Sequence, residues 1–183
     1  RTVFRQVMVD PFARLTVWAD TDPDLAAAEM SIVLDADRPI VAERSMYWSL
    51  DAVSWEDGTV VLGGQEPAAS WGLADVRTGT QAGYDTYILI ANPDDTEARV
   101  RVRFHGDGLP DVVRTFRVQP HSRRTIGTAI MLPELSGRRV AAAIEGLDGA
   151  GVYVESSMYW SAGGRVWSTG VVRSATPLPV PDR

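Results

Sequence analysis

The chain reads Ile40-Val41-Ala42-Glu43-Arg44-Ser45-Met46-Tyr47-Trp48-Ser49, and the pattern returns as Val152-Tyr153-Val154-Glu155-Ser156-Ser157-Met158-Tyr159-Trp160-Ser161. The sequence therefore contains an internal repeat. Its spacing, 157 minus 45, is 112 residues, which is the length of a small β-sandwich module rather than of a solenoid unit. Upstream, Pro11 and Arg14 match Pro120 and Arg123 at a spacing of 109, which is 120 minus 11.

Both copies alternate as β-strands do, so that even-numbered side chains share one face and odd-numbered side chains the other. Neither face is purely polar, which predicts inner strands of a sandwich. An unpaired carboxylate on a covered face costs several kcal/mol, on the order of 3–5, so Glu43 and Glu155 need partners. Each glutamate is predicted to pair with an arginine or a tyrosine of its own copy. The repeat residues given this structural role are Arg14, Glu43, Tyr47, Trp48, Arg123, Glu155, Tyr159 and Trp160.

A catalytic or metal-binding role for the glutamates would require a second carboxylate that repeats with each one, and the sequence has none. The acidic residues 20–24 lack the glycine and the terminal glutamate of a calcium loop, so they predict a solvated turn. Gly-X-Ser-X-Gly and a phosphate-binding glycine loop are both absent, and His105 and His121 fall near turns. We expect no enzyme activity, no cofactor and no metal.

Composition limits the partners and the compartment. The 183 residues carry a net charge of −6, which disfavours nucleic acid. The chain has no cysteine, so it has neither disulfides nor cysteine-ligated zinc. No apolar run reaches the roughly 18 residues that a spanning helix needs, and Arg1 opens no signal-peptide pattern. If the protein is exported, we expect its targeting segment to lie upstream or to have been removed.

Alternation predicts an all-β protein with under about a tenth of its residues in helix. One helical turn is expected at 25–29 and a hairpin at 55–64 around Asp57-Gly58. The other predicted strands are 2–8, 15–18, 30–34, 40–48, 71–74, 87–91, 99–104, 112–118, 124–126, 138–145 and 151–160. Residues 176–181 predict an extended, polyproline-like linker or terminus.

The order of these elements predicts antiparallel, immunoglobulin-like β-sandwich modules in tandem. Residues 69–175 form a complete module, and 176–183 form a Pro-rich tail. Residues 1–68 form a module that lacks its opening strands. We expect residues 1–66 to be completed by strands from outside this segment, supplied by upstream chain or by a neighbouring subunit.

Two sets of side chains are candidates for ligand binding. Arg99, Arg101 and Arg103 alternate with the apolar residues of one strand and could bind an anionic polysaccharide or phosphate, although such a stripe also fits a solvated face. Of the six tryptophans, Trp18, Trp48, Trp71 and Trp160 are expected to be structural, with Trp160 buried. Trp55 and Trp167 are the candidates for exposure and for stacking on sugar rings.

Three strings of residues resemble a known repeat. They are Trp71, then Tyr87-Ile88-Leu89-Ile90-Ala91-Asn92-Pro93, and the string from residue 40 to residue 48. Together they resemble an uncharacterised β-sandwich repeat of secreted bacterial proteins. The resemblance implies an extracellular or cell-envelope location and tandem display. The first hypothesis is therefore a non-catalytic spacer, scaffold or protein-contact module, and the alternative is a carbohydrate-binding module.

Overall fold

The computed structural model describes residues 2–26, 28–48, 57–79, 83–108 and 110–179. The chain divides into two compact units, Arg1–Leu34 and Asp35–Arg183. In the described part of the first unit, one 3-10 turn, η1 (Ala19–Thr21), is the only regular element. The strands predicted at 2–8, 15–18 and 30–34 are therefore wrong. Their apolar runs have no partner strand in this unit, and an unpaired strand is not stable by itself; Phe4 and Met8 are 85% and 87% exposed.

An ion-pair cluster closes the loop of the first unit. The Arg5 guanidinium donates hydrogen bonds to Asp22 at 2.7 Å and to Asp24 at 2.9 Å. The acidic stretch at 20–24 is thus a bend and turn held by an arginine, and the turn continues to residue 26.

The second unit consists of antiparallel strands joined by short turns. Of the residues that the structure describes in the two units together, 50% are in strand and 8% in helix, which confirms the all-β prediction. The elements are β1 (Glu43–Trp48), β2 (Asp57–Leu62), β3 (Ser70–Thr78), β4 (Asp85–Asn92), β5 (Ala98–His105), β6 (Val112–Val118), β7 (Ser122–Gly127), α1 (Thr128–Met131), η2 (Pro133–Leu135), β8 (Arg138–Gly146), η3 (Leu147–Gly149), β9 (Tyr153–Ala162), β10 (Arg165–Ser174) and β11 (Thr176–Pro177).

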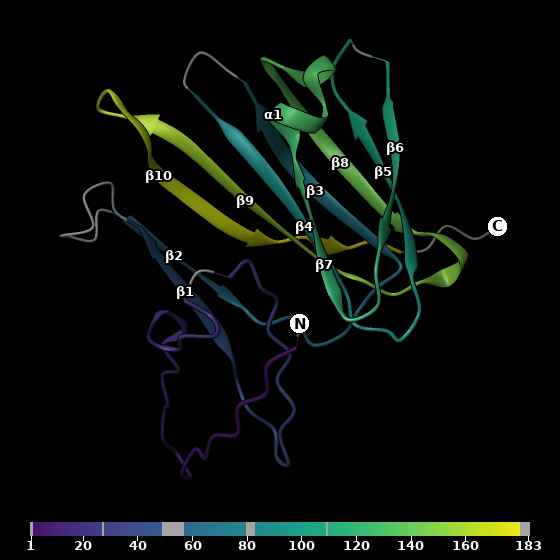
Figure 1. Ribbon diagram of the computed structural model, residues 1–183. Helices are drawn as coiled ribbons and strands as arrows, with labels where there is room; N and C mark the ends of the chain where they lie inside the picture. The colour runs from purple at the N-terminus through teal and green to yellow at the C-terminus, as the bar shows by residue number, and fades with distance from the viewer. Residues whose placement is uncertain (1, 27, 49–56, 80–82, 109, 180–183) are drawn as a thin grey trace. The chain divides into compact units, whose positions relative to one another are not determined.

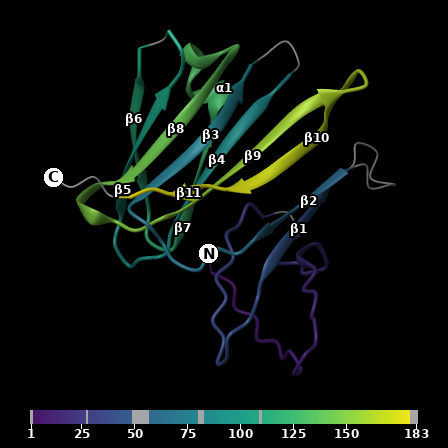
Figure 2. The ribbon, with the colours of Figure 1, turned by 180° about the vertical axis from the view of Figure 1, so that it is seen from behind.

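Two larger sheets face each other as a β-sandwich. One has the strand order β10-β9-β4-β7, and the other has the order β11-β3-β8-β5-β6. Strands β1 and β2 form a separate two-stranded hairpin. Figure 1 shows the first large sheet with β9 and β4 at its centre, and Figure 2 shows the sandwich from behind, with β8 between β3 and β5.

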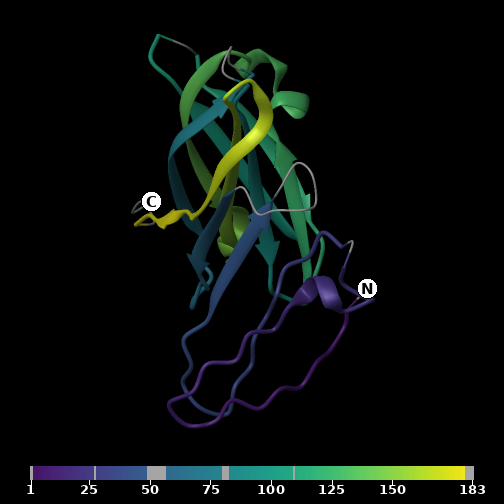
Figure 3. The same ribbon diagram turned by 90° about the vertical axis from the view of Figure 1, so that its left-hand side faces the viewer.

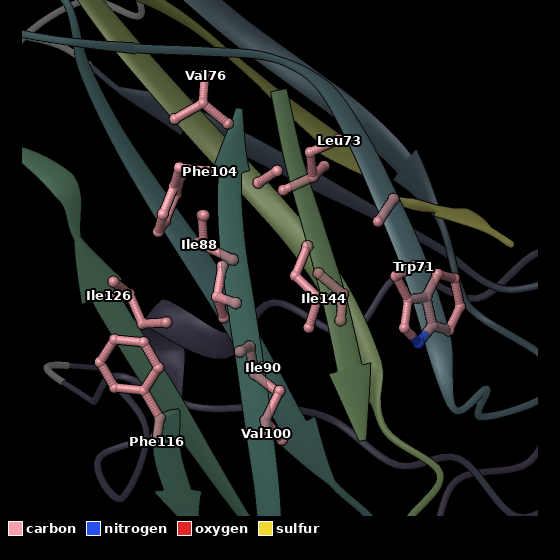
Figure 4. Packing of buried hydrophobic residues seen from close by; sticks show 14 of the residues in the cluster. Trp71, Leu73, Val76, Ile88, Ile90, Val100, Phe104, Phe116, Ile126 and Ile144 are labelled. Atoms are coloured by element: carbon pink, nitrogen blue, oxygen red, sulfur yellow. The ribbon is translucent and has the colours of Figure 1, made fainter. Parts of the chain in front are cut away.

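The core lies between the two sheets and follows the predicted alternation (Figure 4). In β5, Val100 and Val102 are fully buried and Phe104 is 1% exposed, while Arg99 and Arg103 point to solvent. Trp71 is buried at the opening of β3, and its indole N–H donates to the carbonyls of Ala68 and Val152, both at 2.9 Å. A buried indole needs such an acceptor, so Trp71 has the structural role that the sequence predicted.

Two further tryptophans differ from the sequence expectation. Trp18 is 58% exposed, because the strand expected around it does not form. Trp160 is half-buried rather than buried, and its ring stacks on Tyr84 at a centroid distance of 5.5 Å. Trp160 lies near the end of β9, where burial decreases towards the exposed Ala162.

Three elements of the second unit also differ from the sequence expectation. Asp57 and Gly58 open β2, where they pair with Trp48 and Tyr47, instead of forming a hairpin turn. Strand β10 was not predicted, since glycines and a bulge interrupt its alternation. Thr176 and Pro177, expected in a linker or terminus, join β3 as β11. In the part of the chain that the structure describes, no helix is long and apolar enough to cross a membrane.

The alternation of β5 predicts the cost of substitutions on its two faces. Phe104→Ala should lower the free energy of unfolding by about 3–5 kcal/mol, because a large buried aromatic is removed. Arg99→Ala should cost under about 0.5 kcal/mol, because its ion pair with Asp148 is exposed. Urea titrations of the two variants measure both values, and equal losses would contradict the assignment of faces.

Candidate functional site

The hairpin β1–β2 reproduces the hairpin β9–β10 strand for strand. The first pairs Glu43 with Leu62 and Trp48 with Asp57, and the second pairs Glu155 with Ser174 and Trp160 with Thr169. Each of these four residue numbers rises by 112 from the first copy to the second. The duplication found in the sequence therefore continues from β1 into β2 and from β9 into β10, with one register. In Figure 3 the strand β10, drawn in yellow, faces the viewer; it is the edge strand of the four-stranded sheet.

A tyrosine packed over a glycine marks the same place in both hairpins. A Cβ added at Gly58 would lie 2.7 Å from Cδ1 of Tyr47, and a Cβ added at Gly170 would lie 2.7 Å from Cδ1 of Tyr159. Only glycine leaves room for each ring to lie across the neighbouring strand. The sequence carried this signal, because a Gly-X-Val string at Gly58 recurs at Gly170, and 170 minus 58 is also 112.

The first hairpin contacts the second along the edge of β10. The carboxylate of Asp57 accepts hydrogen bonds from the Thr169 hydroxyl and, at 3.3 Å, from the Gly170 amide. The Thr59 hydroxyl oxygen accepts from the Val172 amide, also at 3.3 Å. Side chains of β2 thus occupy backbone donors that an edge strand would otherwise leave for another chain.

The first hairpin also contacts the outward face of β9. The Arg44 guanidinium donates to the Glu155 carboxylate at 2.7 Å, and the Trp48 ring meets the Tyr159 ring edge-on at 5.7 Å. The carboxylate of Glu155 is therefore paired, as predicted, but its partner comes from the other copy of the repeat rather than from Arg123 or a tyrosine of its own. These contacts, together with those of Asp57 and Thr59 to β10, are called the hairpin contact below.

The remaining repeat residues are placed as follows. Arg123 lies on β7, where its backbone pairs with Ala91. Arg14 and Glu43 belong to different units, so the pair expected between them stays a prediction. On β9, the Tyr153 hydroxyl donates to the carbonyl of Gln65 at 3.3 Å, and burial raises the pKa of Tyr153.

Four aromatic side chains gather beside the hairpin contact. Tyr159 is the hub of this aromatic cluster, with ring centroids 5.7 Å from Trp48, 6.1 Å from Tyr87 and 6.1 Å from Trp167. Burial and a hydrogen bond to Asp85 raise the pKa of Tyr87 to about 12. Trp167 is 43% exposed and has a φ of 52°, a strained backbone conformation for an aromatic residue. Trp167 is thus exposed as predicted, whereas Trp55 lies outside the described residues.

The arginines of β5 are matched by acids. Nitrogen-to-oxygen distances are 3.6 Å from Arg99 to Asp148, 3.5 Å from Arg101 to Glu145 and 3.0 Å from Arg103 to Asp111. The structure therefore places the stripe on a solvated face with a carboxylate beside each guanidinium, an arrangement that disfavours a bound anion.

The two histidines also lie beside acids. His105 lies 2.7 Å from Asp111, and its hydrogen bond together with that of Arg103 lowers the pKa of this carboxyl group. His121 lies 2.6 Å from Asp95. Across the described ranges, no group of three or more His, Cys, Asp or Glu side chains is placed to hold a metal ion.

Comparisons with known proteins found two solved structures of low similarity. No protein-family model and no curated protein matches the chain. The chain is similar to the crystal structure of Thermotoga maritima 1070, with 16% identity, a TM-score of 0.49, and coverage of 61% of this chain and 96% of that one. It is also similar to the Anabaena sensory rhodopsin transducer, with 13% identity, a TM-score of 0.41, and coverage of 48% and 93%. Neither likeness supports a function for this chain.

The hairpin contact should depend on acid pH through Asp57. The hydrogen bond from Thr169 lowers the pKa of this carboxyl group below its ordinary value of 3.8, against the opposing effect of burial. A lowered pKa in the folded state means that the contribution to stability is complete above the ordinary value and is lost as pH falls through the lowered pKa. The amide resonance of Gly170 should therefore shift below about pH 4.

The matched control is Asp57→Asn, which keeps the size of the side chain and removes its titration. In this variant the Gly170 amide resonance should not follow pH in the same range. An equal shift in wild type and variant would show that Asp57 does not hold the edge of β10.

Proposed function

We propose that this chain is a non-catalytic interaction module, in which one copy of a repeat docks on the next and so joins immunoglobulin-like sandwiches in tandem. The hairpin contact carries the proposal. It combines an ion pair, an aromatic pair and capped edge amides between two copies related by one register. Specific recognition between modules requires such a mixture of charged, apolar and backbone contacts.

The interactions of the hairpin contact are individually weak, which suits recognition between modules better than formation of a shared rigid core. The side chains of Arg44 and Glu155 are 31% and 26% exposed, so their ion pair contributes about 1 kcal/mol or less after solvent screening. Each edge hydrogen bond adds roughly 0.5–1.5 kcal/mol. A contact of this strength suits modules that must be ordered along a chain, with the boundary predicted near residue 68. The role fits a spacer or scaffold in an exported or cell-envelope protein.

The alternative function is carbohydrate binding, which the exposed ring of Trp167 supports. Its half-exposed ring lies 6.1 Å from the Tyr159 ring at a tilt of 32°, and paired aromatic faces can stack on a sugar. A glycan array combined with tryptophan fluorescence quenching separates the two functions. Carbohydrate binding predicts quenching that Trp167→Ala removes, whereas the docking role predicts no saturable glycan signal.

Cleavage of the linker tests the docking role directly. A specific protease site placed after Gln65 in the full chain should yield two pieces that co-elute in size-exclusion chromatography, because the hairpin contact holds them. Arg44→Ala combined with Asp57→Ala should release the N-terminal piece, and the matched surface variant Arg99→Ala should not. Separation of the wild-type pieces on cleavage would contradict the proposal.

A further inference from the structure

The strand pairing of the second copy indicates which strand would lie beside the first copy. In the four-stranded sheet, β9 lies between β10 and β4. Among the strands that the structure describes, β1 pairs with β2, and the sheet that they form has two strands. Since β1 and β2 correspond to β9 and β10, the position that corresponds to β4 lies beside β1.

Backbone hydrogen bonds fix the direction of this edge. The Gly63 amide donates to the carbonyl of Ala42 at 3.0 Å, and the Ala175 amide donates to that of Val154 at 2.9 Å. Both residue numbers rise by 112, so the two ladders have the same phase. In an antiparallel ladder, alternate residues turn their backbone groups to opposite sides. Ser45 therefore turns its amide away from β2, as Ser157 turns its amide away from β10 and toward β4.

One pair of equivalent apolar positions is buried in the second copy and exposed in the first, as expected if the first copy lacks a neighbouring strand. Val152 is fully buried in the second copy, while its counterpart Ile40 is 52% exposed. An apolar side chain is therefore retained at this position of the first copy, although the described residues leave it half exposed.

We propose that the edge of β1 binds an antiparallel strand of the β4 type, Asp-Thr-Tyr-Ile-Leu-Ile-Ala-Asn, from a further module of the same kind. The inference rests on the proposed role as a repeat-interaction module and names the strand that this module receives. Subtracting 112 from the β9 partners of β4 gives the register. The tyrosine of the incoming strand lies opposite Ser45, its leucine opposite Glu43 and its alanine opposite Val41.

The chemistry of the incoming strand follows from what β4 does in the second copy. Ile88 and Ile90 of β4 are fully buried, and they pair with Ser156 and Val154. Their counterparts in the first hairpin would be Arg44 and Ala42. A strand with aliphatic side chains at these two positions extends the apolar part of this face, which Ala42, Met46 and Trp48 form, whereas a polar strand of the same length does not.

A labelled peptide with the sequence of residues 84–93, added to the full chain, tests this proposal by fluorescence anisotropy. Binding should be saturable, and a scrambled peptide of the same composition should not bind. Ser45→Pro should weaken binding by about tenfold or more, because proline removes an amide from the receiving edge while leaving the bonds to β2 in place. The matched Ser45→Ala variant should bind as the wild type does.

Equal binding by Ser45→Pro and the wild type would overturn the proposal, because the peptide would then be bound elsewhere on the chain. Absence of binding would overturn it as well, and so would concentration-dependent dimerisation that Ser45→Pro abolishes, since the edge would then pair with its own copy. The linker-cleavage result is read separately. If the cleaved pieces stay together and the peptide does not bind, the docking role stands and the partner strand assigned here is wrong.

Discussion

The open edge of β10 is the constraint on which the arrangement of the repeat depends. An edge strand presents amides that pair with any available strand, so a stable protein must occupy or shield them. Here Asp57 and Thr59 place oxygens two residues apart, which matches the spacing of the outward amides of Gly170 and Val172. Side chains can cap an edge in this way without extending the sheet. The hairpin β1–β2 therefore remains a separate two-stranded sheet while it contacts the sandwich.

A second constraint is the shared register of the two hairpins. Tyr47 over Gly58 and Tyr159 over Gly170 hold the strands of each hairpin in one alignment, and a slip by one residue would move every side chain to the opposite face. In the second copy, the alignment directs Glu155 and Tyr159 outward, where Arg44 and Trp48 reach them. The packing of tyrosine over glycine thus fixes the register of each hairpin, and the register determines which side chains the hairpin exposes.

The sequence predicted what depends on local alternation and missed what depends on contact between copies. Alternation identified β5 and its buried Val100, Val102 and Phe104, and the repeat identified β1 and β9. The pairing of Glu155 with Arg44 joins residues 111 positions apart, so no local pattern could reveal it. The bulge between Arg165 and Thr169 hid β10. In the first unit, apolar runs resembled strands, but a strand requires a partner, and the described residues of that unit supply none.

Disulfide trapping tests the central claim that the first hairpin docks on the second through Asp57 and Thr169. The chain has no cysteine, so Asp57→Cys combined with Thr169→Cys introduces a single pair, and disulfide geometry requires close approach of the two side chains. Mild oxidation should give an intramolecular disulfide in the monomer, while Val60→Cys combined with Thr169→Cys should remain reduced. Failure of the first pair to cross-link, or equal cross-linking of both pairs, would contradict the docking of one repeat copy on the other.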